Sequence, residues 1–204
     1  QVIPTLNYVE TMHLRENKDA RSLDFMLEDD TSPIDLITRR YPMIVILKPY
    51  NTCSQICVYC QRNWEISNVL DGKAMATPEQ LNAAYDWIKD HTAIREVLIT
   101  GGDPLVMNDD HIGAILSELS CIDHIERIRI GSRTPVVLPQ RITDTLMDTI
   151  EKFHEPGKRE IALVTHVEHV YEITPEMLEA VQKFKRRGMS VYNQAVFTVE
   201  NSRR

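Results

Sequence analysis

The sequence lacks the features of an exported or membrane-bound chain. No apolar run among its 204 residues approaches the roughly 18 residues needed to cross a membrane. Residues 1–14 contain no basic stretch followed by an apolar one, so we find no signal peptide. There is no excess of positive charge, and the formal net charge of -7 argues against non-specific binding to the phosphate backbone of a nucleic acid. We therefore expect a cytoplasmic protein whose partners include neither a membrane nor a nucleic acid.

Cysteine is scarce, and its placement is uneven. Three of the four cysteines, Cys53, Cys57 and Cys60, fall within eight residues. In a chain without an export signal, such clustering indicates a metal or redox site rather than a disulfide framework. The fourth, Cys121, lies in an apolar stretch, and we expect it to be a buried core cysteine.

Low-complexity segments and internal linkers are also absent, and the apolar and charged fractions of 43% and 26% are typical of globular domains. From residue 41 onward, short apolar runs alternate with helical patterns. The expected strands are 44–47, 97–99, 124–130, 161–164 and 190–198, and the expected helices are 78–90, 108–120, 143–154 and 174–188. This alternation predicts an α/β domain with a parallel sheet, either open or closed into a barrel.

The two ends of the chain differ from this pattern. Residues 1–40 are polar and interrupted by Pro4 and Pro33, so we interpret them as a helical extension outside a core of residues 41–204. The chain stops just after the fifth expected strand. Since an even barrel needs at least one further strand, we expect the chain to be incomplete at its carboxyl end.

The strongest chemical signal is the spacing C-x3-C-x2-C, which directly follows the first expected strand. Three thiolates on one short loop suit an iron–sulfur cube. A cube has four irons, so three ligands leave one iron open to chelate a small molecule. The alternative is a zinc site completed by a distant His or Cys, but zinc sites usually show two C-x2-C pairs and the sequence has no second pair.

With Tyr59 before the last cysteine, the motif resembles that of the radical S-adenosylmethionine (SAM) superfamily. Members cleave SAM reductively to a 5′-deoxyadenosyl radical on a (βα)6 partial barrel. Longer stretches resemble the lysine 2,3-aminomutase family. They are RYP at 40–42, TGGDP at 100–104, RIGSRTPVVLPQRIT at 129–143, TH at 165–166, His169, EIT at 172–174 and NQ at 193–194. The resemblance implies an α/β fold, a radical SAM partial (βα)6-type barrel that is incomplete at its carboxyl end and has an N-terminal helical extension.

The resemblance implies that Cys53, Cys57 and Cys60 hold a [4Fe–4S] cluster and that SAM binds beside it. The residues predicted to bind this cofactor are Tyr59, Gly101, Gly102, Asp103, Ser132, Arg133, His166 and Gln194. Glycines let the backbone approach a ligand, and an arginine can clamp a carboxylate. The alternatives are an ordinary turn at the glycines and an ion pair that locks the loop at Arg133.

The two later positions have their own alternatives. His166 and His169 do not have the H-E-x-x-H spacing of zinc proteases. We predict a hydrogen bond from His166 to SAM or substrate, with a histidine satisfied by loop carbonyls as the alternative. Asn193 and Gln194 end the fifth expected strand, where amides inside a barrel need partners and SAM is a natural one.

The sequence departs from the aminomutase pattern in the residues that concern pyridoxal phosphate (PLP). The glycine-rich stretch with the PLP-binding lysine has no counterpart in this sequence, and Ile44 replaces an arginine near the PLP phosphate. Arg40 is kept and is predicted to contact PLP. The aminomutase family has a run of basic residues around the last cysteine, and Arg62 alone matches an arginine of that run. In the family this arginine helps to hold the substrate carboxylate, so we predict the same role for Arg62. The alternative is a surface arginine.

The resemblance thus implies an isomerase of the lysine 2,3-aminomutase type. A [4Fe–4S] cluster and SAM would generate the radical, and PLP would assist a 2,3-migration of the amino group of an amino-acid substrate. A flavodoxin or ferredoxin would donate the electron, and a homo-oligomer is typical of the family. One alternative is a radical SAM enzyme that acts without PLP on a different substrate. Another is a non-catalytic iron–sulfur or zinc-binding domain.

Overall fold

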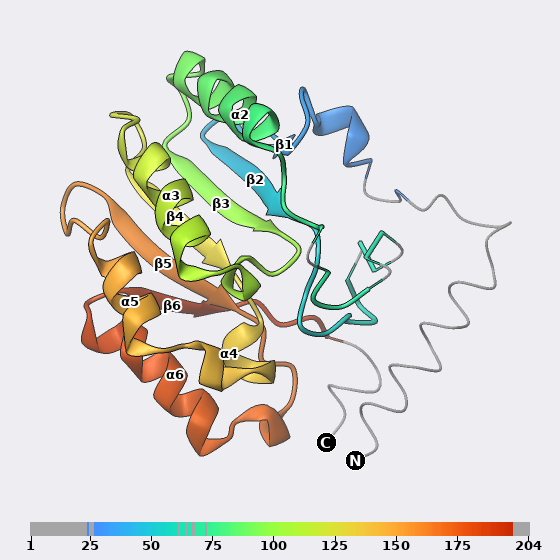
Figure 1. The fold of residues 1–204 in the computed structure, drawn as a ribbon, viewed down its shortest axis with the longest axis vertical. Helices are drawn as coiled ribbons and strands as arrows, with labels where there is room; N and C mark the ends of the chain where they lie inside the picture. Colours follow the sequence, from blue (N-terminus) through green and yellow to red (C-terminus); the bar gives the residue numbers. More distant parts are fainter. Residues whose placement is uncertain are drawn as a thin grey trace, which may run out of the picture.

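The computed structural model describes residues 24, 27–60, 62–63, 65–66, 68–71 and 73–197. Within these residues, six strands form one sheet in the order β1-β2-β3-β4-β5-β6 (Figure 1). They are β1 (Ile37–Thr38), β2 (Ile44–Tyr50), β3 (Glu96–Gly101), β4 (Arg127–Gly131), β5 (Glu160–Thr165) and β6 (Ser190–Asn193). Strands β2 to β6 are parallel, which confirms the five predicted strands, and the sheet is mixed only because β1 runs antiparallel to β2. The sheet is not closed among the described residues, as in a partial barrel.

The predicted helical extension falls largely outside the described residues. Its described part contains the 3-10 turn η1 (Asp29–Thr31) and the short strand β1. Ile37 of β1 is fully buried in the main core, so these last residues before position 40 belong to the sheet. A strand of two residues is too short to show an alternating pattern, which is why the sequence did not predict it.

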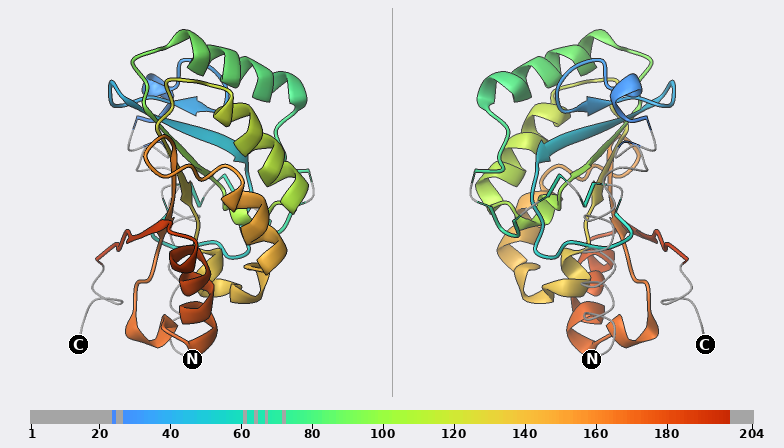
Figure 2. Two further views of the ribbon diagram at one scale, coloured as in Figure 1. Left: turned by 90° about the vertical axis from the view of Figure 1, so that its left-hand side faces the viewer. Right: turned by 90° about the vertical axis from the view of Figure 1, so that its right-hand side faces the viewer.

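Four helices cover one face of the sheet, as the edge-on views of Figure 2 show. They are α2 (Pro78–Asp90), α3 (Asp109–Ser120), α5 (Asp144–Glu151) and α6 (Pro175–Arg186). Each begins after a side chain that accepts a backbone N–H of the first turn, and the four caps are Thr77, Asn108, Thr143 and Thr174. The shorter pieces are η2 (Pro104–Val106), α4 (Thr134–Val137), η3 (Pro139–Arg141) and η4 (Val170–Glu172).

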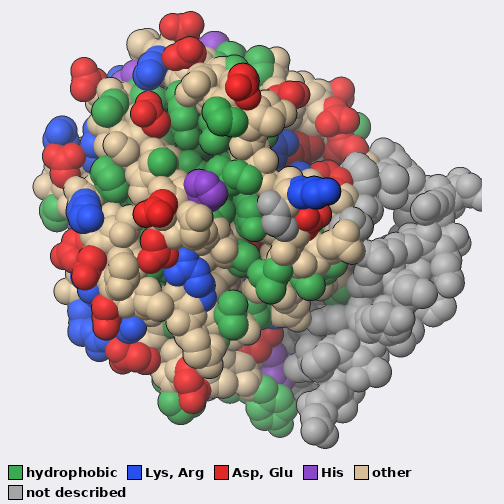
Figure 3. Space-filling model, in the orientation of Figure 1, with side chains coloured by type: hydrophobic (Ala, Val, Ile, Leu, Met, Phe, Trp, Pro, Cys, Tyr) green, Lys and Arg blue, Asp and Glu red, His purple; other side chains and the backbone are tan. Residues whose placement is uncertain are grey.

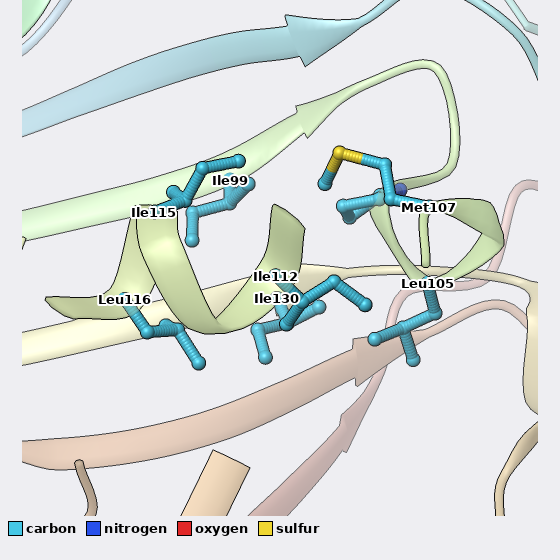
Figure 4. A pocket seen from close by; sticks show the side chains of 8 residues that line it. Ile99, Leu105, Met107, Ile112, Ile115, Leu116 and Ile130 are labelled. Atoms are coloured by element: carbon cyan, nitrogen blue, oxygen red, sulfur yellow. The ribbon is translucent and has the colours of Figure 1, made fainter. Parts of the chain in front are cut away.

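The main core lies between the sheet and these helices. Leu47, Ile99, Ile130 and Leu163 share the helix-facing side of their strands in one register, and all are buried. Between β3, β4 and α3 the packing leaves one small cavity with a volume of about 10 Å³ (Figure 4). Its lining is entirely apolar, so it offers no polar partner to a water molecule.

The prediction for Cys121 was wrong. Cys121 is exposed at the C-cap of α3, because the helical period turns Leu116 and Leu119 toward the core and leaves the next position outside.

The opposite face of the sheet is polar. Glu96 pairs there with Arg129 and, at 3.4 Å, with Arg127, which also lies 3.5 Å from Glu160. On the outer surface of the covering helices, acidic and basic side chains are interspersed with apolar ones (Figure 3). Within the described ranges, no helix is long and apolar enough to span a bilayer.

Candidate functional site

Apart from Arg40, the predicted site residues converge on one edge of the sheet. Parallel strands end together, so the loops that follow β2, β3, β4 and β5 meet at their carboxyl ends. The cysteine loop follows β2 and returns to it through a bridge between Tyr50 and Met75. Thr52 anchors the loop internally, because its hydroxyl donates to the carbonyl of Asn68 at 2.8 Å and accepts from the N–H of Asp71 at 3.2 Å.

All three cysteines of this loop are free and partly buried. Burial raises the pKa of Cys53 to about 12, and the negative charges of Asp103, Cys60 and Cys57 add to the effect. Burial also raises the pKa of Cys60, with a further contribution from Cys57. Thiols that repel one another as thiolates need a cation beside them to stay deprotonated, and a bound metal centre supplies that charge.

The spacing of the three cysteines fits an iron–sulfur cluster. A zinc ion gathers its ligands around one centre, whereas each thiolate of a cube binds a different iron. The spacing on one loop matches the second arrangement.

Asp103 connects the loops after β3 and β4. Its buried carboxylate accepts from the Ser132 hydroxyl at 2.6 Å and from the N–H groups of Arg133 at 2.8 Å, Thr134 at 2.9 Å and Leu105 at 3.1 Å. Burial nevertheless raises the pKa of this carboxyl. Asp103 and Ser132 thus hold the site together in this structure, while the SAM contacts predicted for their side chains stay predictions.

Gly101 and Gly102 are required by close packing. Gly101 has a φ of +107°, and a Cβ there would lie 2.9 Å from Cβ of Lys48 and 3.0 Å from Nη1 of Arg62. A Cβ at Gly102 would lie 2.2 Å from the carbonyl oxygen of Thr52. The two glycines bring the ends of β2 and β3 together, and their predicted approach to SAM remains a prediction.

Arg133 lies against the cysteine loop. Its Nη1 is 3.2 Å from Sγ of Cys57 and 3.3 Å from Oε1 of Gln55, and its guanidinium carbon lies 5.7 Å from the centre of the Tyr59 ring. Its Nη2 donates to Glu172. The predicted alternative of an ion pair that locks the loop is therefore present, and Arg133 joins three segments of the site.

His166 and Gln194 lie side by side, while the SAM contacts predicted for them stay predictions. The N–H of Gln194 donates to the carbonyl of Thr165 at 2.8 Å, which places it next to His166. Burial lowers the pKa of His166, so its imidazole stays neutral at pH 7. Asn193 instead pairs with the backbone of Val167, at 2.7 Å and 3.1 Å.

Several buried polar atoms around this edge lack a hydrogen-bond partner within the described part of the chain. They are Oγ of Ser54, the hydroxyl of Tyr59, Nη1 of Arg62, Oγ1 of Thr134 and of Thr165, Nδ1 of His166 and Oε1 of Glu168, and the last two lie 4.0 Å apart. Buried polar atoms in folded proteins are nearly always paired, so a group of unpaired ones at one edge indicates a polar ligand. SAM, with its carboxylate, ammonium and ribose, fits such a set.

Arg62 is not a surface arginine. Its Nε and Nη2 donate to Glu65 at 3.0 Å and 2.5 Å, and Nη2 also donates to Oδ1 of Asn51 at 2.9 Å. These contacts leave the buried Nη1 beside Gly101 for another acceptor. The sequence did not predict Glu65 as part of the site, because a single acidic residue after a cysteine motif carries no signal.

Arg40 is not brought to this edge. Arg40 lies between β1 and β2, just before the amino end of β2. The cysteine loop begins at the carboxyl end of β2. The seven residues of β2 separate the two. The predicted contact of Arg40 with PLP stays a prediction.

Comparison with known proteins decides the family. The sequence model described as "Radical SAM superfamily" matches residues 47–202. The chain belongs to the radical SAM superfamily. Along all of this chain, it is 47% identical to an uncharacterized KamA family protein of Methanocaldococcus jannaschii, of which it covers 32%.

Two relatives named as aminomutases extend the comparison. The chain is 39% identical to L-lysine 2,3-aminomutase of Clostridium subterminale over 96% of its own length and 44% of that enzyme. It is 38% identical to glutamate 2,3-aminomutase of Clostridioides difficile over 90% of its length and 42% of that enzyme. The predicted resemblance to lysine 2,3-aminomutases is thereby confirmed. The chain spans less than half the length of these relatives.

Proposed function

We propose that this radical SAM chain forms the cofactor-binding part of an enzyme that acts on an amino-acid substrate. The main support is the junction of the three-cysteine loop with Arg133 and a group of unpaired buried polar atoms at one edge of a parallel sheet. In this proposal Cys53, Cys57 and Cys60 hold a [4Fe–4S] cluster. The cluster and SAM supply, when bound, the reductive cleavage that yields a 5′-deoxyadenosyl radical.

The chain's own residues would bind and orient the cofactor. His166 offers an unpaired Nδ1, and Gln194 lies next to it. The guanidinium of Arg133 lies over the Tyr59 ring, 5.7 Å from its centre, and joins this part of the cysteine loop to the loop after β4. The Asp103–Ser132 hydrogen bond fixes the two loops behind it, so the site keeps its shape without a ligand to organise it.

For the substrate we propose an amino acid whose amino group migrates between carbons 2 and 3, as the names of the relatives indicate. Arg62 would bind the substrate carboxylate through Nη1, since Glu65 already occupies Nε and Nη2. An electron donor of the flavodoxin or ferredoxin type, a homo-oligomer and a cytoplasmic location belong to the same proposal.

PLP enters this proposal through the aminomutase resemblance alone, and we assign no step to it. The second candidate is a radical SAM enzyme that acts without PLP. The observation that favours it is Ile44, which stands where the family has an arginine.

Anaerobic reconstitution with iron and sulfide, followed by EPR of the dithionite-reduced protein, tests the proposal. We expect a [4Fe–4S]⁺ signal that changes when SAM is added. Cys57→Ala should lose the signal, and the matched control Cys121→Ala should keep it, because Cys121 is exposed outside the site. A cluster that ignores SAM would support a non-catalytic iron–sulfur domain, and stoichiometric zinc in place of iron would support the zinc alternative.

A further inference from the structure

Arg133 is held in the site entirely by protein groups. Its Nε donates to the carbonyl of His166 at 3.3 Å, its Nη1 to Gln55 and Cys57, and its Nη2 to Glu172. Its side chain is 10% exposed and that of Glu172 is 16% exposed. Every nitrogen of the guanidinium thus has a partner.

The position of Arg133 is set by two further contacts. Its backbone N–H donates to the buried carboxylate of Asp103 at 2.8 Å, and this hydrogen bond fixes the backbone from which the side chain extends. At the other end, Glu172 is itself held, because Oε2 accepts the N–H of Glu168 at 2.8 Å. A guanidinium restrained at both ends keeps its contact with the Cys57 sulfur without losing much side-chain entropy on binding.

We propose that Arg133 tunes the reduction potential of the cluster by donating to the sulfur of Cys57. This inference rests on the proposed function, because it requires the cluster to be held by the three cysteines. One-electron reduction adds one negative charge to the cluster and its thiolates. A nearby fixed cation and an N–H···S hydrogen bond stabilise the more negative, reduced state, so Arg133 raises the potential.

Glu172 opposes this effect. Its carboxylate neutralises part of the Arg133 charge through Nη2, while Nη1 contacts the sulfur. The Arg133–Glu172 pair therefore predicts two shifts of opposite sign: loss of the arginine lowers the potential, and loss of the carboxylate raises it. A purely structural role for the pair predicts no such opposition.

The test is an EPR-monitored redox titration of the reconstituted protein without SAM. We expect Arg133→Gln to move the midpoint potential to more negative values and Glu172→Gln to move it to more positive ones. Arg133→Lys keeps the positive charge but loses the planar guanidinium with its several N–H donors, so its midpoint potential should lie between those of the wild type and Arg133→Gln. Arg141→Gln is the matched control, because Arg141 has a similar ion pair with Asp109 at 2.6 Å in a different part of the fold.

Each outcome decides a separate point. A wild-type protein that assembles no cluster overturns the proposed function, and with it the basis of the inference. If the wild-type protein assembles a cluster and both Arg133→Gln and Glu172→Gln have the wild-type midpoint potential, the inference alone is overturned. If Arg133→Gln does not fold or hold a cluster, Glu172→Gln still decides, and a shift of zero or to more negative values counts against the proposal.

Discussion

Asp103 illustrates how a polar residue in a motif acquires its role from its surroundings. The sequence places it after two glycines, where a carboxylate suits a cationic ligand. In the folded chain, four donors from the β3 and β4 loops surround it. A buried carboxylate with that many protein donors holds loops together, because leaving any of them unpaired would cost about 1–3 kcal/mol.

Glu28 and Lys48 form a second polar contact beside the site. Both side chains are mostly buried, and Glu28 also accepts from the hydroxyl of Thr38 at 3.3 Å. Burial raises the pKa of Glu28, but the hydrogen bond and charge of Lys48 outweigh it and hold the pKa below its ordinary value of 4.5. The pair therefore stabilises the fold when Glu28 is ionised.

We expect Glu28→Gln to destabilise the protein by about 2 kcal/mol at pH 7. Because the folded pKa of Glu28 is lowered, this stabilisation is complete above the ordinary carboxyl pKa and is lost as the pH falls through the folded value. The difference between wild type and variant should thus shrink toward pH 3, as measured by urea unfolding. Glu160→Gln removes an exposed ion pair and should have little effect at either pH. A difference that is equal at both pH values would contradict the role of ionisation.

At the scale of elements, the site depends on how closely β2 and β3 approach at their ends. The N–H of Gly102 donates to the carbonyl of Tyr50 at 2.7 Å, and that of Asp103 to the carbonyl of Thr52 at 2.8 Å. These bonds continue the sheet into the start of the cysteine loop. The loop is thereby tied to β3 before the first cysteine is reached.

Gly102→Ala should destabilise the protein by about 3 kcal/mol, because the added Cβ meets backbone atoms of Thr52 that cannot turn aside. Thermal unfolding followed by circular dichroism measures the effect. Gly157→Ala is the control: its Cβ would meet nothing within 4 Å, and its φ of +82° alone should cost about 1–2 kcal/mol. Equal losses in the two variants would show that the β2–β3 approach is looser than the structure indicates.

At the scale of the whole molecule, the helix-covered face is apolar and closely packed while the site edge has unpaired polar atoms. Among the described residues of the cysteine loop and its ends, Tyr50 and Met75 pack against the core between sheet and helices, and the others lie outside it. We therefore expect the domain to fold without the cluster and cluster binding to add to its stability. A ligand that binds the folded state alone stabilises it by mass action.

Cluster assembly should raise the melting temperature of the wild-type chain by roughly 6–12 °C, which corresponds to about 3 kcal/mol for a protein of this size. Anaerobic scanning calorimetry of the apo and reconstituted forms measures this difference, and limited proteolysis of the 51–76 loop should slow in parallel. Cys57→Ala should show neither change. A fully loaded wild-type protein that melts at the apo temperature would mean that the loop is already as stable without the cluster.

The sequence by itself determined the order of the five parallel strands, the four helix starts and the three cysteines that carry the resemblance. These features depend on local patterns: alternation, capping residues and spacing along one loop. The tertiary structure decided the rest, because it depends on residues far apart in the chain. It added the antiparallel β1, exposed Cys121, joined Arg133 to Cys57 across 76 residues, and made Asp103 a brace between loops. It also placed Arg40 at the far end of β2, since the direction of a strand separates residues that are close in sequence.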